Sequence, residues 1–291
     1  MCNSWRTIVS PPFSERRIGG APPAIRLRHA TKRFAGLGKK EVFTALDDLT
    51  LDIARGSYVA LIGSNGAGKS TLLSILMGTL LLDEGSLHID DEDMSEKPSW
   101  QRASKIALVR QNPEHNVLSS LSIEENFALA VMGRERAFRL RRYDRDGVRL
   151  AARSALQRFG MGLEDRLGES TGTLSGGQRQ AVAMAMAAVR NPRVLLLDEH
   201  VSALDPKRAK IVADVTGEIV RAQDITTVMV THDLGHALSH TDRVLMMHRG
   251  KVVMDLSGEK KAALDVAELA AQFERLVGEA LPDRTLLAAA S

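Results

Sequence analysis

The sequence is poor in cysteine and in aromatic residues, and it contains no long apolar run. A single cysteine, Cys2, excludes an intrachain disulfide and argues against a cysteine-based metal site. The most apolar stretch, TLLSILMGTLLL at 71–82, is shorter than the roughly 18 residues of a membrane-spanning helix. The N-terminus lacks the apolar segment of roughly 7–15 residues that a signal peptide needs. We therefore expect a cytoplasmic protein.

Hydrophobic residues make up 44% of the chain and charged residues 26%, close to the average of globular proteins, so the composition indicates neither a disordered nor a fibrous protein. The net charge of +3 comes from one basic segment, RERAFRLRRYDRDGVRLAAR at 134–153, because the rest of the chain is slightly acidic. Such a segment could contact phosphates of nucleic acid or lipid, or form a solvated helix face. No aromatic platform for stacking bases accompanies it, so we expect no nucleic-acid partner.

Short apolar runs that favour β-strands alternate along the chain with segments of helical spacing. The expected strands are 25–34, 57–63, 105–110, 194–198 and 226–230, with a hairpin at 243–256 around Arg249 and Gly250. The expected helices are 68–78, most of the segment from about 112 to 190, and 260–276. This alternation predicts an α/β fold with a mainly parallel sheet that is covered on both faces.

The stretch GSNGAGKS, Gly63 to Ser70, matches the pattern G-x-x-x-x-G-K-[ST] between a predicted strand and a predicted helix. Glycines let backbone N–H groups turn toward an anion, and the helix N-terminus adds partial positive charge. We expect Lys69 to reach the β- and γ-phosphates of a nucleotide and Ser70 to bind Mg²⁺. A plain glycine-rich turn is the simpler alternative, and the flanking strand and helix argue against it.

The apolar run VLLLDE ends in two neighbouring acids, Asp198 and Glu199. A phosphate–Mg²⁺ site needs a carboxylate at the tip of a neighbouring strand, and we assign Asp198 to that metal. Successive side chains on a strand point to opposite faces, so Glu199 is expected to point away from the metal. From there Glu199 would polarise the water that attacks the γ-phosphate.

Two further motifs, TLSGGQRQ at 173–180 and VTHD at 230–233, complete a recognisable set. In order and spacing, the motifs resemble those of the ATP-binding cassette (ABC) ATPases over residues 24–256. By itself, Ser175 can cap the helix that follows, and Gly176 and Gly177 permit close approach of an anion. The resemblance implies a P-loop NTPase (RecA-like) core with an ABC-type antiparallel β region and a helical subdomain.

The resemblance divides the chain into three parts. Residues 1–23, rich in Pro, Ser and Gly, are expected to be a flexible leader. Residues 24–256 form the ABC ATPase domain, with the helical subdomain at about 112–190. Residues 257–291 form a C-terminal helical tail that is too short for a regulatory domain of usual size.

The resemblance also implies that two copies of the chain enclose two ATP molecules, each between the P-loop of one copy, Gly63 to Ser70, and Ser175–Gln178 of the other. Glu199 corresponds to the general base, His232 to the histidine that holds the γ-phosphate and water, and Gln111 to a glutamine that contacts Mg²⁺. The expected catalytic residues are therefore Glu199, His232 and Gln111, and the expected metal ligands are Ser70, Gln111 and Asp198. The expected nucleotide-binding residues are Phe34, Gly63, Ser64, Asn65, Gly66, Ala67, Gly68, Lys69, Ser70, Thr71, Ser175, Gly176, Gly177, Gln178 and Asp205.

Two of the nucleotide-binding residues, Asp205 and Phe34, are also assigned from the resemblance. Asp205, in SALDP, corresponds to the loop that reaches across the dimer. Phe34 corresponds to the aromatic residue that stacks on adenine, where a tyrosine is commoner, and Phe43 is a possible substitute.

The chain departs from most relatives after Glu199, where His200 replaces a proline and Val201 replaces a threonine. A tolerated turn variant is one explanation. The DEH ending also resembles importer ATPases that work with a small permease and an extracytoplasmic substrate-binding protein, often for amino acids.

We therefore expect an ATPase at the inner face of the cell membrane that energises separate transmembrane permease subunits. In the family the helical subdomain lies toward the permease, so the arginine-rich segment is expected to contact permease loops or lipid headgroups. The alternative is a cytoplasmic ATP-switched assembly factor with soluble partners.

Overall fold

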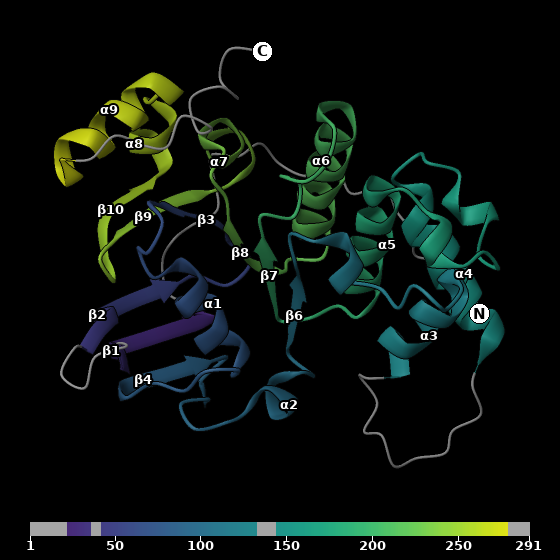
Figure 1. Ribbon diagram of the computed structural model, residues 1–291, viewed down its shortest axis with the longest axis horizontal. Coiled ribbons are helices and arrows are strands. Elements are labelled where there is room, and N and C mark those ends of the chain that lie inside the picture. Colours follow the sequence, from purple (N-terminus) through teal and green to yellow (C-terminus); the bar gives the residue numbers. More distant parts are fainter. Residues whose placement is uncertain (1–21, 36–41, 133–143, 279–291) are drawn as a thin grey trace.

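Two sheets with helices around them make up the described part of the chain, residues 22–35, 42–132 and 144–278, in a computed structural model (Figure 1). The expected leader, apart from its last two residues, lies outside the described residues. So does the first half of the arginine-rich segment, from residue 134 to residue 143.

The larger sheet has the strand order β10-β9-β3-β8-β7-β6, and it is parallel except for the edge strand β10. The predicted mainly parallel sheet is therefore confirmed. Its strands are β3 (Tyr58–Gly63), β6 (Ile106–Val109), β7 (Val194–Asp198), β8 (Thr226–Val230), β9 (Arg243–His248) and β10 (Lys251–Ser257). Parallel strands place their carboxyl ends at one edge, so the residues after β3, β6, β7 and β8 gather there.

The smaller sheet is antiparallel, with the order β2-β1-β4-β5, and agrees with the expected antiparallel region. Of its strands, only the first was predicted from the sequence. The strands are β1 (Ile25–Ala35), β2 (Val42–Ile53), β4 (Glu84–Ile89) and β5 (Glu92–Asp93). In β2, buried Leu49, Leu51 and Ile53 alternate with exposed residues, which is the pattern of a strand with one face on the core.

Helix α1 (Lys69–Met77) packs between the two sheets, because its leucines and isoleucine share one apolar core with strands of both. The opposite face of the parallel sheet forms a second core with the other long helices. These are α3 (Ile123–Met132), α4 (Arg145–Gln157), α5 (Gly176–Val189), α6 (Pro206–Ala222), α7 (Leu234–His240) and α9 (Val266–Val277).

Between β6 and β7 the described residues form helices and turns, apart from one isolated β-bridge between Ser122 and Ser170, and α3, α4 and α5 lie together at one end of the molecule (Figure 1). Short 3-10 turns η1 (Pro113–His115), η2 (Leu163–Asp165) and η3 (Thr171–Thr173) connect them. A further short helix, α2 (Ser99–Arg102), precedes β6. None of the described helices is long and apolar enough to cross a membrane.

The prediction of one helix over 260–276 is wrong, because two helices, α8 (Gly258–Ala262) and α9, occupy this segment. Asp265 starts α9 with a capping box, in which its side chain accepts from the N–H of Glu268 and the Glu268 side chain accepts from the N–H of Asp265. A residue committed to an N-cap cannot continue the preceding helix, so the chain breaks there.

Candidate active site

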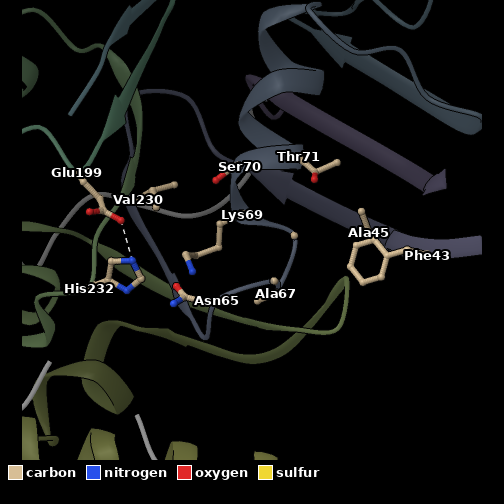
Figure 2. A pocket seen from close by; sticks show the side chains of 12 residues that line it. Phe43, Ala45, Asn65, Ala67, Lys69, Ser70, Thr71, Glu199, Val230 and His232 are labelled. Atoms are coloured by element: carbon tan, nitrogen blue, oxygen red, sulfur yellow. Dashed lines mark ion pairs between the residues drawn. The ribbon is translucent and has the colours of Figure 1, made fainter. Parts of the chain in front are cut away.

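The carboxyl edge of the parallel sheet carries a pocket of about 210 Å³ (Figure 2). The P-loop forms one wall, and residues that follow β7 and β8 form another. The lining residues are Phe43, Ala45, Asn65, Gly66, Ala67, Gly68, Lys69, Ser70, Thr71, Glu199, Val230 and His232. The fold therefore brings Lys69 together with Glu199, although 130 positions separate them in the sequence.

Lys69 is the first residue of α1, and its side chain is buried. Its ammonium group donates hydrogen bonds to the carbonyl oxygens of Gly63, at 2.7 Å, and Ser64, at 2.9 Å. Burial lowers the pKa of Lys69, and the carboxylates of Glu199 and Asp198 counteract part of that shift. The pocket thus holds a partly desolvated cation, which suits a polyanionic substrate such as a nucleotide phosphate chain.

The backbone around the P-loop explains two of its glycines. Gly68 has a φ of 101°, and a Cβ there would lie 2.3 Å from the carbonyl oxygen of Ala45. Gly63 has a φ of 149°, and a Cβ there would lie 2.2 Å from the carbonyl oxygen of Met247. Only glycine allows β2 and β9 to approach the loop this closely.

Glu199 and His232 face each other at the pocket wall opposite Phe43 (Figure 2). Nε2 of His232 lies 2.7 Å from Oε1 of Glu199. This hydrogen bond is the main reason that the pKa of Glu199 is lowered, since burial acts in the opposite direction. Glu199 is therefore held as an ionised carboxylate, which is the state that can accept a proton from water.

The prediction that strand alternation sets the direction of Glu199 is wrong. Strand β7 ends at Asp198, and Glu199 has a φ of 47°, in the left-handed region. Its N–H donates to the carbonyl oxygen of Val230 at 3.0 Å. A tight turn held by β8 therefore directs the side chain, not the alternation of a continuing strand.

Asp198, at the tip of β7, is half-buried and does not line the pocket. Burial is the main cause that raises its pKa, and the neighbouring carboxylate of Glu199 adds to it. A cation near both acids would relieve this repulsion.

Gln111 does not line the pocket either, and its Nε2 donates to Oγ of Ser202 at 3.1 Å.

Ser175–Gln178 and Asp205 also lie outside the pocket lining. Ser175 caps α5, as the sequence predicted, and the structure adds a capping box with Gln178. Oγ of Ser175 also accepts a hydrogen bond from the guanidinium of Arg208 at 3.2 Å. Asp205 caps α6 by accepting from the N–H of Arg208 at 3.1 Å.

The aromatic wall of the pocket is Phe43, whereas Phe34 is not among the lining residues. The two are paired in register across β1 and β2. Sequence reasoning did not find Ala45 and Val230, which contribute small or apolar surface. No sequence signal marks such wall residues, because only their position in the fold brings them to the pocket.

Comparisons with known proteins agree with this geometry. The sequence model of the ABC transporter family matches residues 46–202. The chain is 37% identical to the tyrosine transport ATP-binding protein of Clostridioides difficile, over 80% of this chain and 92% of that protein. It is 34% identical to the phosphonates import ATP-binding protein PhnC of Agrobacterium fabrum, over 84% of each chain.

Solved structures give the same result. A dimeric ATP-binding cassette in a post-hydrolysis state, bound to ADP and Pi, is 27% identical with a TM-score of 0.68, over 80% of this chain and 98% of that one. The cbiO1 protein of Clostridium perfringens, part of the ABC transporter complex cbiONQ, is 25% identical with a TM-score of 0.70. The match covers 92% of this chain and 99% of that one. The expected P-loop NTPase fold of the ABC type is confirmed. The chain belongs to the ABC transporter family, as one of its ATP-binding, ATP-hydrolysing subunits.

Proposed function

We propose that this ATPase powers an importer by acting on separate transmembrane permease subunits at the inner face of the cell membrane. The observation that supports ATP hydrolysis as the driving reaction is a pocket lined by Lys69 and, opposite it, by the Glu199–His232 pair. Import is supported by relatives whose names describe import, including those for phosphonates and for aliphatic sulfonates. An amino acid is the proposed solute, supported by the tyrosine transport relative.

In the proposed mechanism, the P-loop binds the phosphates of ATP and Lys69 neutralises the β- and γ-phosphates. Glu199 accepts a proton from the attacking water, and His232 keeps its carboxylate ionised and oriented through the 2.7 Å contact. Phosphoryl transfer depends mainly on positioning and on charge neutralisation, and these residues supply both. Phe43, at the far end of the pocket, is the better-placed residue to stack on adenine.

The residues around the pocket fit Mg²⁺. This ion prefers oxygen ligands and is usually held by one or two carboxylates together with substrate phosphates. Ser70 offers a hydroxyl in the pocket, Asp198 a half-buried carboxylate with a raised pKa, and Gln111 an amide oxygen. We propose these three as its ligands. When bound, Mg²⁺ would neutralise charge on the phosphates.

A second copy of the chain would complete each site. Ser175–Gln178 and Asp205 do not line the pocket of their own chain, so they are available to the nucleotide of a partner copy. The solved relative with ADP and Pi is itself dimeric. An extracytoplasmic substrate-binding protein is the further proposed partner, which would deliver the solute to the permease.

The test is to purify tagged Glu199→Gln protein from detergent-solubilised native membranes with ATP and Mg²⁺, and to identify partners by mass spectrometry. We expect slow hydrolysis, a stable ATP-bound dimer and a multi-span membrane protein in stoichiometric amount. Solute specificity would follow from the binding protein that copurifies. Recovery of soluble partners alone would overturn the transport proposal and leave the assembly-factor alternative.

Glu199→Gln combined with Lys69→Ala is the matched control, because weak nucleotide binding should prevent formation of the ATP-bound dimer. Normal ATP affinity after Lys69→Ala would overturn the assignment of the P-loop. Rapid hydrolysis by Glu199→Gln would overturn the assignment of Glu199 as base.

The arginine-rich segment 134–153 is proposed to contact the permease or lipid headgroups. Arg141 and Arg142 lie outside the described residues, and Nε of Arg145 contacts Oε1 of buried Glu124 at 2.6 Å. Reversing Arg145 would therefore disturb the fold. Charge reversal at Arg141, Arg142 and exposed Arg153 is the cleaner test, and unchanged membrane association would contradict the proposal.

A further inference from the structure

His200 follows Glu199 directly, and its imidazole is fully buried, with 1% exposure. Neither ring nitrogen has a hydrogen-bond partner among the described residues. The ring therefore contributes to the structure through packing rather than through hydrogen bonds. A wholly buried side chain restricts the backbone that carries it, so the position of this ring constrains the turn at Glu199.

The ring of His200 packs toward helix α7. Its centroid lies 5.9 Å from that of His236, at an interplanar angle of 43°. His236 is also buried, with 7% exposure, and its Nε2 has no partner in the described part of the chain. The ring of His240 meets His236 edge-on at 4.6 Å, and Nε2 of His240 lies 3.0 Å from Oδ1 of Asp214 on α6.

Helix α7 begins directly after the segment that carries His232. Asp233 caps this helix by accepting from the N–H of His236 at 2.8 Å, and His232 immediately precedes that cap. The contact between His200 and His236 thus joins the turn that carries Glu199 to the helix that follows His232. These are the two segments whose side chains meet at 2.7 Å in the pocket.

The turn at Glu199 needs such support. A left-handed φ of 47° is unfavourable for a glutamate and persists only when the surroundings hold it. On the solvent-exposed side of the turn, Ser202 donates hydrogen bonds from its N–H, at 3.0 Å, and its hydroxyl, at 2.9 Å, to the carbonyl oxygen of Glu199. On the buried side, the packed ring of His200 holds the residue that follows Glu199.

We propose that His200 and His236 form a positioning pair, whose packing holds the Glu199 carboxylate against His232. The inference rests on the proposed role of Glu199 as base. His200→Ala should lower kcat about tenfold or more and change the affinity for an ATP analogue less than twofold, because neither histidine lines the pocket. His236→Ala should have the same effect, and the double variant should be no slower than the slower single variant.

The conservative variant His200→Leu separates packing from imidazole chemistry. Leucine nearly matches the volume of histidine and leaves no buried nitrogen unpaired, so kcat should return to within threefold of the original. A kcat as low as that of His200→Ala would overturn the packing mechanism. His88→Ala is the matched control, because His88 lies in the other sheet and its Nδ1 is also buried without a partner in the described residues.

A double-mutant cycle tests whether His200 acts through Glu199. Single-turnover hydrolysis of radiolabelled ATP is measured for His200→Ala, Glu199→Gln and their combination. His200→Ala should slow hydrolysis less than twofold in the Glu199→Gln background. An equal loss in both backgrounds, or no loss in the parent chain, would overturn the inference. Fast hydrolysis by Glu199→Gln alone would instead overturn the proposed role of Glu199.

Discussion

The side-chain amide of Gln111 donates a hydrogen bond to Oγ of Ser202 at 3.1 Å, across 91 positions of the sequence. Gln111 follows β6, at the start of the helical segment, whereas Ser202 closes the turn after Glu199. One hydrogen bond therefore links the helical segment to the turn that carries the proposed base.

We expect Ser202→Ala to lower kcat about threefold to tenfold, since it removes this link from the Glu199 turn. Gln111→Ala should lower kcat at least as much, because it also removes a proposed ligand of Mg²⁺. The affinity of Ser202→Ala for an ATP analogue should change little, because Ser202 does not line the pocket. Steady-state hydrolysis at saturating ATP and Mg²⁺ measures the effect. If the losses multiply in the double variant, the two residues act independently and the link has no catalytic role.

Gly68→Ala should destabilise the protein and abolish nucleotide binding. Its φ of 101° is strained for alanine, and the added Cβ would lie 2.3 Å from the carbonyl oxygen of Ala45. The matched comparison is Gly66→Ala, where φ is 78° but no atom lies within 4 Å of the added Cβ. We expect Gly66→Ala to cost about 1–3 kcal/mol from backbone strain alone, and Gly68→Ala clearly more. Urea unfolding measures both, and equal losses would contradict the close approach of β2.

The site residues that could be predicted from the sequence belong to short motifs of adjacent residues. The P-loop and the two acids at the end of β7 are short patterns, and a parallel sheet necessarily brings them to one edge. The aromatic wall is different, because the choice between Phe34 and Phe43 depends on the pairing of β1 with β2. That pairing contains three register shifts, which no local pattern in the sequence reports.

Backbone turns and helix caps account for the other differences between the predicted and the observed structure. The direction of Glu199 depends on a left-handed φ, which β8 and the packing around His200 hold in place. The break between α8 and α9 depends on a capping box at Asp265, within a segment whose apolar spacing is helical throughout. In both places, tertiary contacts or side-chain hydrogen bonds override the periodicity on which the prediction was based.

Gly176→Ala should separate folding from function in the segment Ser175–Gln178. Gly176 is the first residue of α5, and an added Cβ would meet only Cγ of Pro113, at 4.0 Å. Alanine favours helices more than glycine does, so thermal stability should be unchanged or slightly higher. If a partner copy's nucleotide lies against this glycine, ATPase activity should fall at least tenfold. Full activity would contradict the proposed contact.

Gly177→Ala is a useful companion, because the added Cβ would lie 2.6 Å from Cδ of Arg208. The Arg208 side chain is flexible and can move, at the cost of its hydrogen bond to Ser175. We expect a loss of about 0.5–1.5 kcal/mol in the free energy of unfolding, the usual net contribution of a hydrogen bond. In an Arg208→Ala background, Gly177→Ala should therefore cause no further loss of stability. A loss that persists in that background would mean that the added methyl group is strained against other atoms.

Acid should destabilise the protein through His236. Burial, with the nearby imidazole of His240, lowers the pKa of His236 to about 4, and Asp233 and Asp214 act in the opposite direction. In the unfolded chain the pKa is about 6.5, so between pH 6.5 and pH 4 the unfolded state binds more protons than the folded state. The free energy of unfolding should therefore fall as pH decreases through this window, by at most about 1.4 kcal/mol per pH unit for this group, and level off above pH 7.

His236→Leu should reduce that slope, because it removes the group that becomes protonated only on unfolding. Urea unfolding at several pH values between 4.5 and 8 is the measurement, with His29→Leu, an exposed histidine, as the control. Part of the slope should remain, since burial also lowers the pKa of His200, to about 3. An unchanged slope in His236→Leu would mean that His236 is protonated in the folded protein, which its burial without a partner for Nε2 in the described residues argues against.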